Sequence, residues 1–134
     1  MVALAKDRNT PVRLGNIESH PIKSATTIFA GSMVFVDATG FAVPGATALG
    51  LTAVGRAEQH IENDGANGDK RVETRRGVFR FENSGGVDEL TRGDIGDTAY
   101  AVDDQTVAKT SATNTRSAAG IVRDVDDHGV WIEI

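Results

Sequence analysis

Short apolar stretches, separated by turn-forming residues, run along most of the chain. In residues 27–37 the apolar side chains occupy both odd and even positions, which predicts a strand covered on both faces. Ala38-Thr39-Gly40 predicts a turn, and residues 41–43 resume as a short strand that Pro44-Gly45 ends. The pattern therefore predicts a hairpin. Residues 46–54 fit a short helix or a strand, and Gly50 and Thr52 favour strand or irregular structure.

Three further hairpins follow from the same kind of pattern. Val72 and Thr74 alternate with charged residues, so their strand has one apolar and one charged face. Phe79 and Phe81 likewise share one face of the stretch 78–82, and Val130, Ile132 and Ile134 share one face of the stretch 130–134. Residues 83–97 form a turn-rich crossover in which Thr91 and Asp94 cap at most one helical turn. The predicted hairpins pair 55–62 with 70–76 around the loop 63–69, 98–102 with 106–109, and 118–125 with 130–134.

These elements predict an all-β protein of eight to ten short antiparallel strands, folded as a small β-sandwich or barrel. Residues 1–24 are polar and contain Pro11 and Pro21. They predict an extended N-terminal arm with one short strand near 12–17. Residues 25–134 then make up the β-sandwich or barrel domain. A free N-terminal arm is usually disordered. In an oligomer or a shell, such an arm instead lies on a neighbouring subunit.

Composition narrows the possible chemistry. With 134 residues the chain suits one domain, and with no cysteine it has no disulfide, thiolate nucleophile or cysteine zinc site. Since no apolar stretch is long enough to cross a bilayer, we expect no membrane partner. The apolar run from Val2 to Ala5 is too short for a secretory signal, so synthesis in the cytoplasm is expected.

Charge is distributed unevenly along the chain. The formal net charge is −5. Through Arg80 there are 10 basic and 8 acidic residues, net +2, and from Phe81 onward 4 basic and 11 acidic, net −7. The overall acidity argues against direct nucleic-acid binding. The asymmetry would help copies or partners meet in one orientation, although solvated strand faces explain most such charges.

Catalytic and metal motifs are sparse. Residues 124–129 open like a calcium loop, but His128 replaces an oxygen ligand and the required Glu would fall one residue past Ile134. An Asp-rich hairpin turn explains the same residues. His20, His60 and His128 lie far apart, and no nucleophile elbow or phosphate-binding glycine loop is present. We expect no catalytic residue, metal or cofactor.

The basic residues of 70–80 form one cluster, in which Arg71 and Arg75 share a strand face and Arg76 follows. This pattern fits a contact with a partner, a subunit or phosphate, as well as a solvated face. Without interleaved aromatic residues it does not support a nucleic-acid platform.

The segment Gly120-Ile-Val-Arg-Asp124-Val-Asp126-Asp-His-Gly129, with Arg116-Ser117, partly resembles the deoxyuridine triphosphatase family. The family's aromatic residue and its C-terminal glycine-rich phosphate arm are missing, and its two motifs are farther apart than these. This resemblance implies a nucleotide hydrolase as an alternative, in which Asp124 and Asp126 serve catalysis.

A longer resemblance rests on the order of several segments. They are Val54-Gly-Arg-Ala57, Arg76-Gly-Val-Phe79, Ala99-Tyr-Ala-Val-Asp-Asp-Gln-Thr-Val-Ala-Lys-Thr110 and Ala119-Gly-Ile-Val-Arg-Asp-Val-Asp-Asp-His-Gly-Val-Trp-Ile132. Together they resemble the capsid cement, or head decoration, proteins of tailed bacteriophages and Mu-like prophages. The resemblance spans about Ala30 to Trp131 and leaves the N-terminal arm outside it.

This resemblance implies a non-enzymatic virion protein on the outer surface of the expanded capsid. It would bind the major capsid protein as a dimer or trimer and cement neighbouring subunits. We expect the arm to order on capsid protein. The candidate contact residues are Lys6, Arg8, Arg13, Arg71, Arg75, Arg76, Phe41 and Trp131. The alternatives are a tail or head-completion protein, the nucleotide hydrolase above and a carbohydrate-binding sandwich.

Overall fold

The computed structural model describes residues 2–13 and 15–134, and nearly all of its regular structure is β-strand. Two single 3-10 turns, η1 (Gly86–Asp88) and η2 (Arg92–Asp94), interrupt the strands. The predicted all-β class is confirmed. The strands are β1 (Ile17–Pro21), β2 (Thr26–Ile28), β3 (Met33–Val36), β4 (Ala42–Pro44), β5 (Thr52–Ala57), β6 (Ile61–Asn63), β7 (Arg71–Arg75), β8 (Val78–Phe81), β9 (Thr98–Ala101), β10 (Val107–Ala108), β11 (Ala118–Asp126) and β12 (Gly129–Glu133).

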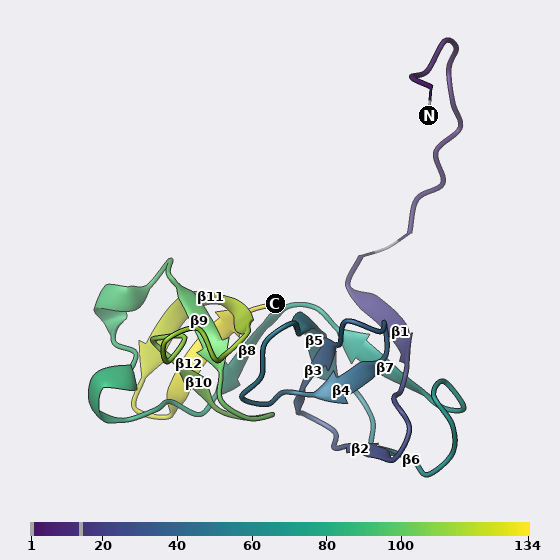
Figure 1. Ribbon diagram of the computed structural model, residues 1–134. Helices are drawn as coiled ribbons and strands as arrows, with labels where there is room; N and C mark the ends of the chain where they lie inside the picture. The colour runs from purple at the N-terminus through teal and green to yellow at the C-terminus, as the bar shows by residue number, and fades with distance from the viewer. Residues whose placement is uncertain (1, 14) are drawn as a thin grey trace.

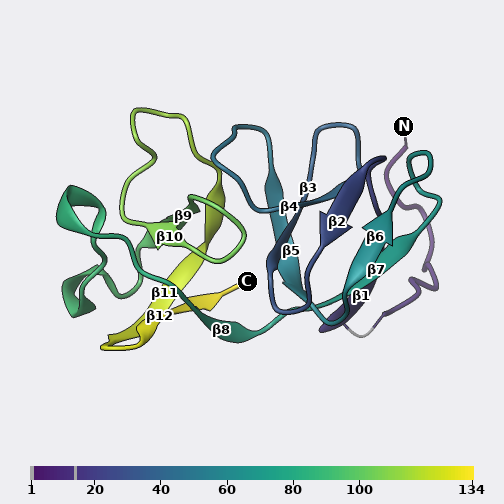
Figure 2. The ribbon, with the colours of Figure 1, turned by 90° about the horizontal axis from the view of Figure 1, so that it is seen from below.

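The body consists of two lobes that lie side by side (Figure 1). The first lobe contains β1 to β7, with a five-stranded sheet in the order β1-β7-β5-β3-β4 and a two-stranded ribbon, β2-β6. The second lobe contains β8 to β12 and both 3-10 turns, with a five-stranded sheet in the order β10-β9-β11-β12-β8. The chain passes between the lobes once after β7, through Arg76 and Gly77 (Figure 2).

Strand β3 supplies side chains to both cores of the body. Met33 and Phe35 are fully buried in the core that contains most of the second lobe's apolar residues. Val34 and Val36 point the other way, into the core that β2 and β6 cover. This alternation follows from the two-residue repeat of a strand. The predicted covering of both faces is confirmed for β3. The prediction of one strand over 27–37 is wrong, because β2 ends at Ile28 and a turn separates it from β3, which belongs to another sheet.

Three of the predicted hairpins are present. They are β3–β4, β9–β10 and β11–β12. The predicted faces are also correct in β7, where Val72 and Thr74 are buried, and in β12, where Val130 and Ile132 are buried.

The predicted hairpin between 55–62 and 70–76 is correct only at its base, where Arg56 and Ala57 of β5 pair with Arg75 and Thr74 of β7. β5 also pairs with β3, and the far part of the predicted hairpin is wrong, because β6 is a separate strand that pairs with β2. The buried Asn63 side chain explains why the chain leaves the sheet here, since its amide donates to the carbonyls of Ile22, Lys23 and Ala66. A buried polar group requires such partners, and they fix the loop that follows β6.

The predicted arm, residues 1–24, is too long. β1 pairs with β7 over its whole length, and Ile22 beyond it is fully buried. The short strand expected near 12–17 therefore begins at the end of that range and belongs to the body. The exposed extended segment comprises residues 2–13 and 15–16, and we call it the arm. Met1 and Leu14 lie outside the described residues.

Within the part of the chain that the structure describes, no helix is long and apolar enough to cross a membrane.

Candidate interaction surface

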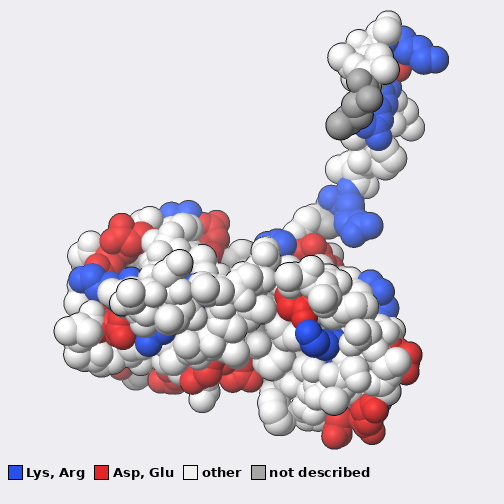
Figure 3. Space-filling model, viewed as in Figure 1, with Lys and Arg blue, Asp and Glu red and all other residues white. Residues whose placement is uncertain are grey.

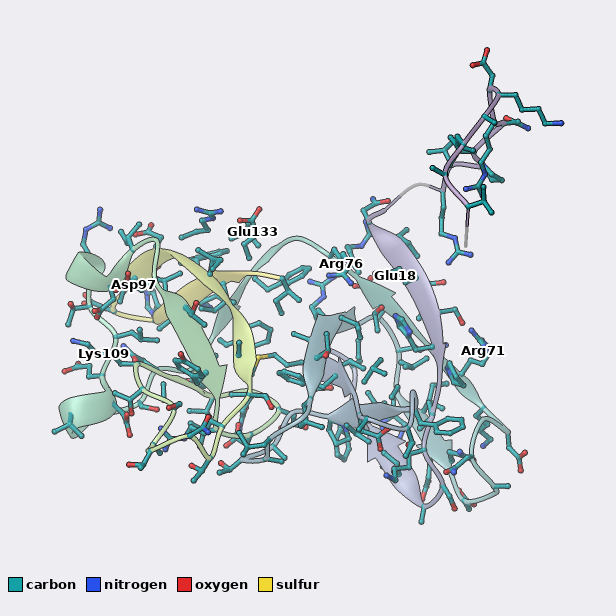
Figure 4. The ribbon with its side chains drawn as sticks, turned by 45° about the horizontal axis from the view of Figure 1, so that its top comes forward. Glu18, Arg71, Arg76, Asp97, Lys109 and Glu133 are labelled. Carbon is teal, nitrogen blue, oxygen red and sulfur yellow. The ribbon has the colours of Figure 1, made fainter. Side chains whose placement is uncertain are left out.

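The predicted basic cluster lies on β7, beside β1. The Arg71 guanidinium donates to Ser19, from Nε to Oγ at 2.9 Å and from Nη2 to the carbonyl oxygen at 2.8 Å. Arg71 and Arg76 lie toward opposite ends of the strand, and Arg76 points toward Glu18 (Figure 4). The cluster is thus spread along β7, the strand next to the edge strand β1, rather than gathered at a point.

Of the three arginines of this cluster that the sequence predicts as contact residues, two form ion pairs with carboxylates of the same body. Arg76 Nε lies 2.5 Å from Glu18 Oε1, and Arg75 Nε lies 3.5 Å from Glu58 Oε2. Arg56 also binds Glu58, at 2.6 Å, and this hydrogen bond is the main reason that the pKa of the Glu58 carboxyl lies below its usual value. Because these charges are satisfied within the body, the basic cluster mainly joins β1 and β5 to β7.

The two predicted aromatic contact residues lie in different lobes. Phe41, half-buried in the β3–β4 turn, faces Gly68 of the loop after β6. Trp131, half-buried on β12, donates from Nε1 to Asp126 Oδ2 at 2.9 Å, and the Arg80 guanidinium lies over its ring at 5.8 Å. The structure therefore does not bring Phe41 and Trp131 into one contact patch.

The arm carries the remaining predicted contact residues, Lys6, Arg8 and Arg13. All three are exposed. The nine ion pairs among the described residues lie entirely within the body. Blue basic side chains are spaced along the otherwise mostly white arm (Figure 3).

The formal charge of the chain separates into three parts. Residues 1–16 contain three basic residues and Asp7, net +2. Residues 17–77, which include the first lobe, contain 6 basic and 7 acidic residues, net −1, and residues 78–134 contain 5 and 11, net −6. The sum of +2, −1 and −6 is the total of −5. Most of the excess negative charge therefore belongs to the second lobe, and the first lobe is nearly balanced.

An acidic hollow of about 540 Å³ lies on the second lobe, between the loop that contains η1 and η2 and the β11–β12 hairpin. We call it the acidic groove. Four carboxylates and one arginine line it, and Glu82, Glu89 and Asp127 form no ion pair. The complete lining is Glu82, Asn83, Glu89, Leu90, Thr91, Arg92, Val125, Asp126, Asp127, His128 and Gly129.

Local hydrogen bonds hold the loop side of the acidic groove in place. The Asn83 side chain accepts from the Leu90 backbone N–H at 3.0 Å and donates to the Leu90 carbonyl at 2.8 Å. Thr91 and Asp94 form the predicted capping box at η2. The hydrogen bond from the Thr91 backbone is the largest cause that lowers the pKa of Asp94.

The carboxylates considered for calcium or nucleotide chemistry, Asp124 and Asp126, accept hydrogen bonds from groups of the β11–β12 hairpin and from Arg92 of η2. Asp126 accepts from the His128 backbone and from Trp131, and the Trp131 hydrogen bond is the first cause of its lowered pKa. Asp124 pairs with Arg92 and accepts from the Val125 backbone. Among the described residues no three His, Cys, Asp or Glu side chains converge on a metal position.

Sequence reasoning missed the residues of the acidic groove. Its carboxylates are separated by up to 45 positions along the chain, from Glu82 to Asp127. The sequence indicated this region only through the net charge of −7 from Phe81 onward. It could not identify the groove, because a charge count carries no information about which residues meet in space.

Comparison with protein-family models, with curated proteins and with solved structures finds no match.

Proposed function

We propose that this chain is a non-enzymatic structural protein of a tailed-bacteriophage virion. It binds the outer surface of the expanded capsid and cements neighbouring major capsid subunits. The proposal starts from the sequence resemblance to capsid cement proteins, and one structural observation supports it most strongly. This observation is an exposed, extended arm that leaves a packed all-β body.

An arm of this kind is suited to linking subunits. Ordering an extended segment on a neighbour costs conformational entropy, and backbone hydrogen bonds and buried side chains offset that cost only when the neighbour is present. Val2 and Val12 are each 95% exposed and Leu4 is 74% exposed, so the arm has apolar surface left to bury. Many equivalent sites on one shell would then add avidity.

The arrangement of the carboxylates supports a structural role over hydrolysis. In the hairpin that resembles the nucleotide hydrolases, both oxygens of Asp126 accept hydrogen bonds from their own hairpin. At Asp124, the Arg92 side chain and the Val125 backbone both contact Oδ1. A general base or metal ligand needs a carboxylate oxygen directed toward substrate or metal.

The test is co-sedimentation of the purified chain with heads assembled from the major capsid protein of the same virus. We expect saturable binding to expanded, undecorated heads and none to unexpanded proheads, with a fixed number of copies per head. A chain lacking residues 2–13 should bind far more weakly. Substitution of the exposed first-lobe residue Lys70→Ser is the matched control and should bind normally.

Two results would contradict the proposal. One is a folded full-length chain that binds neither form of the head, which would favour a tail or head-completion role. The other is equal binding to expanded heads and proheads, because a cement protein must recognise the surface that expansion creates.

A further inference from the structure

We infer that the arm of one copy of this chain lies in the acidic groove of a second copy. The proposed function requires the arm to reach a neighbour in the shell, and this inference names that neighbour and the surface it offers. It also applies in solution, where no capsid protein is present.

Charge complementarity is the first argument. Among the described residues, the three arm cations, Lys6, Arg8 and Arg13, form no ion pair, and Glu82, Glu89 and Asp127 of the groove form none either. The nearly balanced first lobe contains no comparable net charge. Docking would pair the positive part of the chain with the negative part, and complementary potentials of this kind select partner and orientation.

The bend in the arm fits a groove with carboxylates on two walls. Lys6 lies in a bend with Ala5, and Arg8 follows two residues later. Because the chain changes direction there, the two side chains are not confined to one side of the arm. In the groove, Glu89 comes from the loop wall and Asp127 from the β11–β12 hairpin. The two cations can therefore meet carboxylates while the backbone between them follows the groove.

Apolar side chains occur on both surfaces as well. Leu4 precedes the cations of the arm, and Val125 is half-buried in the groove lining. Covering Val125 and Leu4 together would remove apolar surface from water in addition to pairing charges.

The occupant is a second copy rather than the chain's own arm. The arm leaves the body at β1, on the outer side of the first lobe, and points away from both lobes (Figure 1). The groove's loop, with η1 and η2, lies at the opposite end of the second lobe in both ribbon views. Sixteen extended residues span roughly 50 Å, which is enough to reach a neighbouring body.

The test compares the association of charge-reversed full-length chains by sedimentation equilibrium. The arm-reversed chain carries Lys6→Glu, Arg8→Glu and Arg13→Glu. The groove-reversed chain carries Glu82→Lys, Glu89→Lys and Asp127→Lys. Each alone should associate about 100-fold more weakly than the unmodified chain, since three attractive rim pairs become repulsive. A chain with both sets of changes should regain association, because the sign of every pair is restored.

A matched control reverses three exposed first-lobe carboxylates, Glu62→Lys, Asp64→Lys and Glu73→Lys. This control should associate like the unmodified chain. Near-ultraviolet circular dichroism of Trp131, the single tryptophan, verifies that each body is folded. The arm-reversed chain keeps every described ion pair of the body, so its association is informative even if the groove-reversed chain does not fold.

The inference is overturned if the full-length chain is monomeric at all concentrations or if arm reversal leaves association unchanged. It is also overturned if the combined chain folds without regaining association. None of these results involves heads. Failure here together with normal binding to expanded heads would refute the arm–groove contact alone, whereas the co-sedimentation experiment would refute the function.

Discussion

The two lobes of the body differ in how they use charged side chains. In the first lobe, residues 17–77, 6 basic and 7 acidic residues nearly balance, and Glu18 and Glu58 pair with arginines that connect three strands of one sheet. In the second lobe, residues 78–134, 11 acidic residues outnumber 5 basic ones, and the unpaired carboxylates include three around one groove. The ion pairs of the first lobe support its own sheet. The second lobe carries the larger net charge, −6.

This difference indicates where an interaction surface lies. A cluster of charged residues in the sequence indicates a contact with another molecule only when those charges form no ion pairs in the folded chain. Arg75 and Arg76 meet carboxylates of their own lobe. Glu82, Glu89 and Asp127 meet none.

The largest expected effect comes from Phe35→Ala, at the core where the two lobes meet. Phe35 is fully buried with second-lobe residues. Removing its ring should cost about 3–5 kcal/mol of unfolding free energy. Urea unfolding should show one transition, followed both by Trp131 fluorescence and by far-ultraviolet circular dichroism. Two separate transitions in the unmodified chain would mean that the lobes fold independently and that β3 does not couple them.

Acid should destabilise both lobes. The pKa values of Asp37 and Glu58 in the first lobe, and of Asp88, Asp94 and Asp126 in the second, are all lowered, mainly by hydrogen bonds to their charged forms. A lowered folded-state pKa gives stability that is present above the unfolded pKa and is lost as pH falls.

The melting temperature should therefore fall once the pH drops below about 4, the ordinary range of carboxyl groups. Burial, followed by the neighbouring Asp103 charge, raises the pKa of Asp104, which offsets a part of this loss. Thermal unfolding at stepped pH is the measurement. A melting temperature that is constant or rises on acidification would show that the paired carboxylates do not support the fold.

A smaller effect separates the paired from the unpaired carboxylates. Glu18→Gln removes the partner of Arg76 and should cost about 0.5–1 kcal/mol of unfolding free energy. Glu89→Gln in the groove should leave the unfolding free energy within about 0.5 kcal/mol of the unmodified chain. Chemical denaturation measures both. An equal loss in the two variants would remove the contrast between the lobes.

The smallest expected effect on stability is that of the arm. Deleting residues 2–13 removes exposed residues that form no ion pair with the body, so the unfolding free energy should change by less than about 0.5 kcal/mol. The same deletion should strongly reduce both self-association and binding to heads. A marked loss of stability instead would show that the arm is part of the fold.

Much of the fold follows from local sequence patterns. The hairpins at β3–β4, β9–β10 and β11–β12 each combine two short apolar strands with a polar turn, and their pairing requires only neighbouring residues. The alternation in β7 and β12 likewise predicts which side chains are buried. The capping box at η2 is a local pattern too.

The errors concern partners that are distant in sequence. β1 belongs to the sheet only because β7, more than 50 residues later, pairs with it, and its polar sequence gives no apolar signal. The Asn63 side chain, at the end of β6, donates hydrogen bonds to backbone carbonyls about 40 residues earlier in the chain. These hydrogen bonds hold the end of β6 beside residues 22 and 23, outside the predicted hairpin.

The candidate contact residues show the same limit. The sequence predicted Arg71, Arg75 and Arg76 as a contact but could not show that Ser19, Glu58 and Glu18 bind them. The proposed contact between the arm and the acidic groove depends instead on which charges remain unpaired after folding.

The most direct test of the central claim is an electron cryomicroscopy reconstruction of expanded heads saturated with this chain. The account predicts density for the two-lobed body on the outer surface, over junctions between capsid subunits. It also predicts arm density that enters the groove between the Glu89 loop and the Asp127 hairpin of an adjacent copy. Absence of the body from the outer surface, or its presence only at the tail or the portal vertex, would contradict the account.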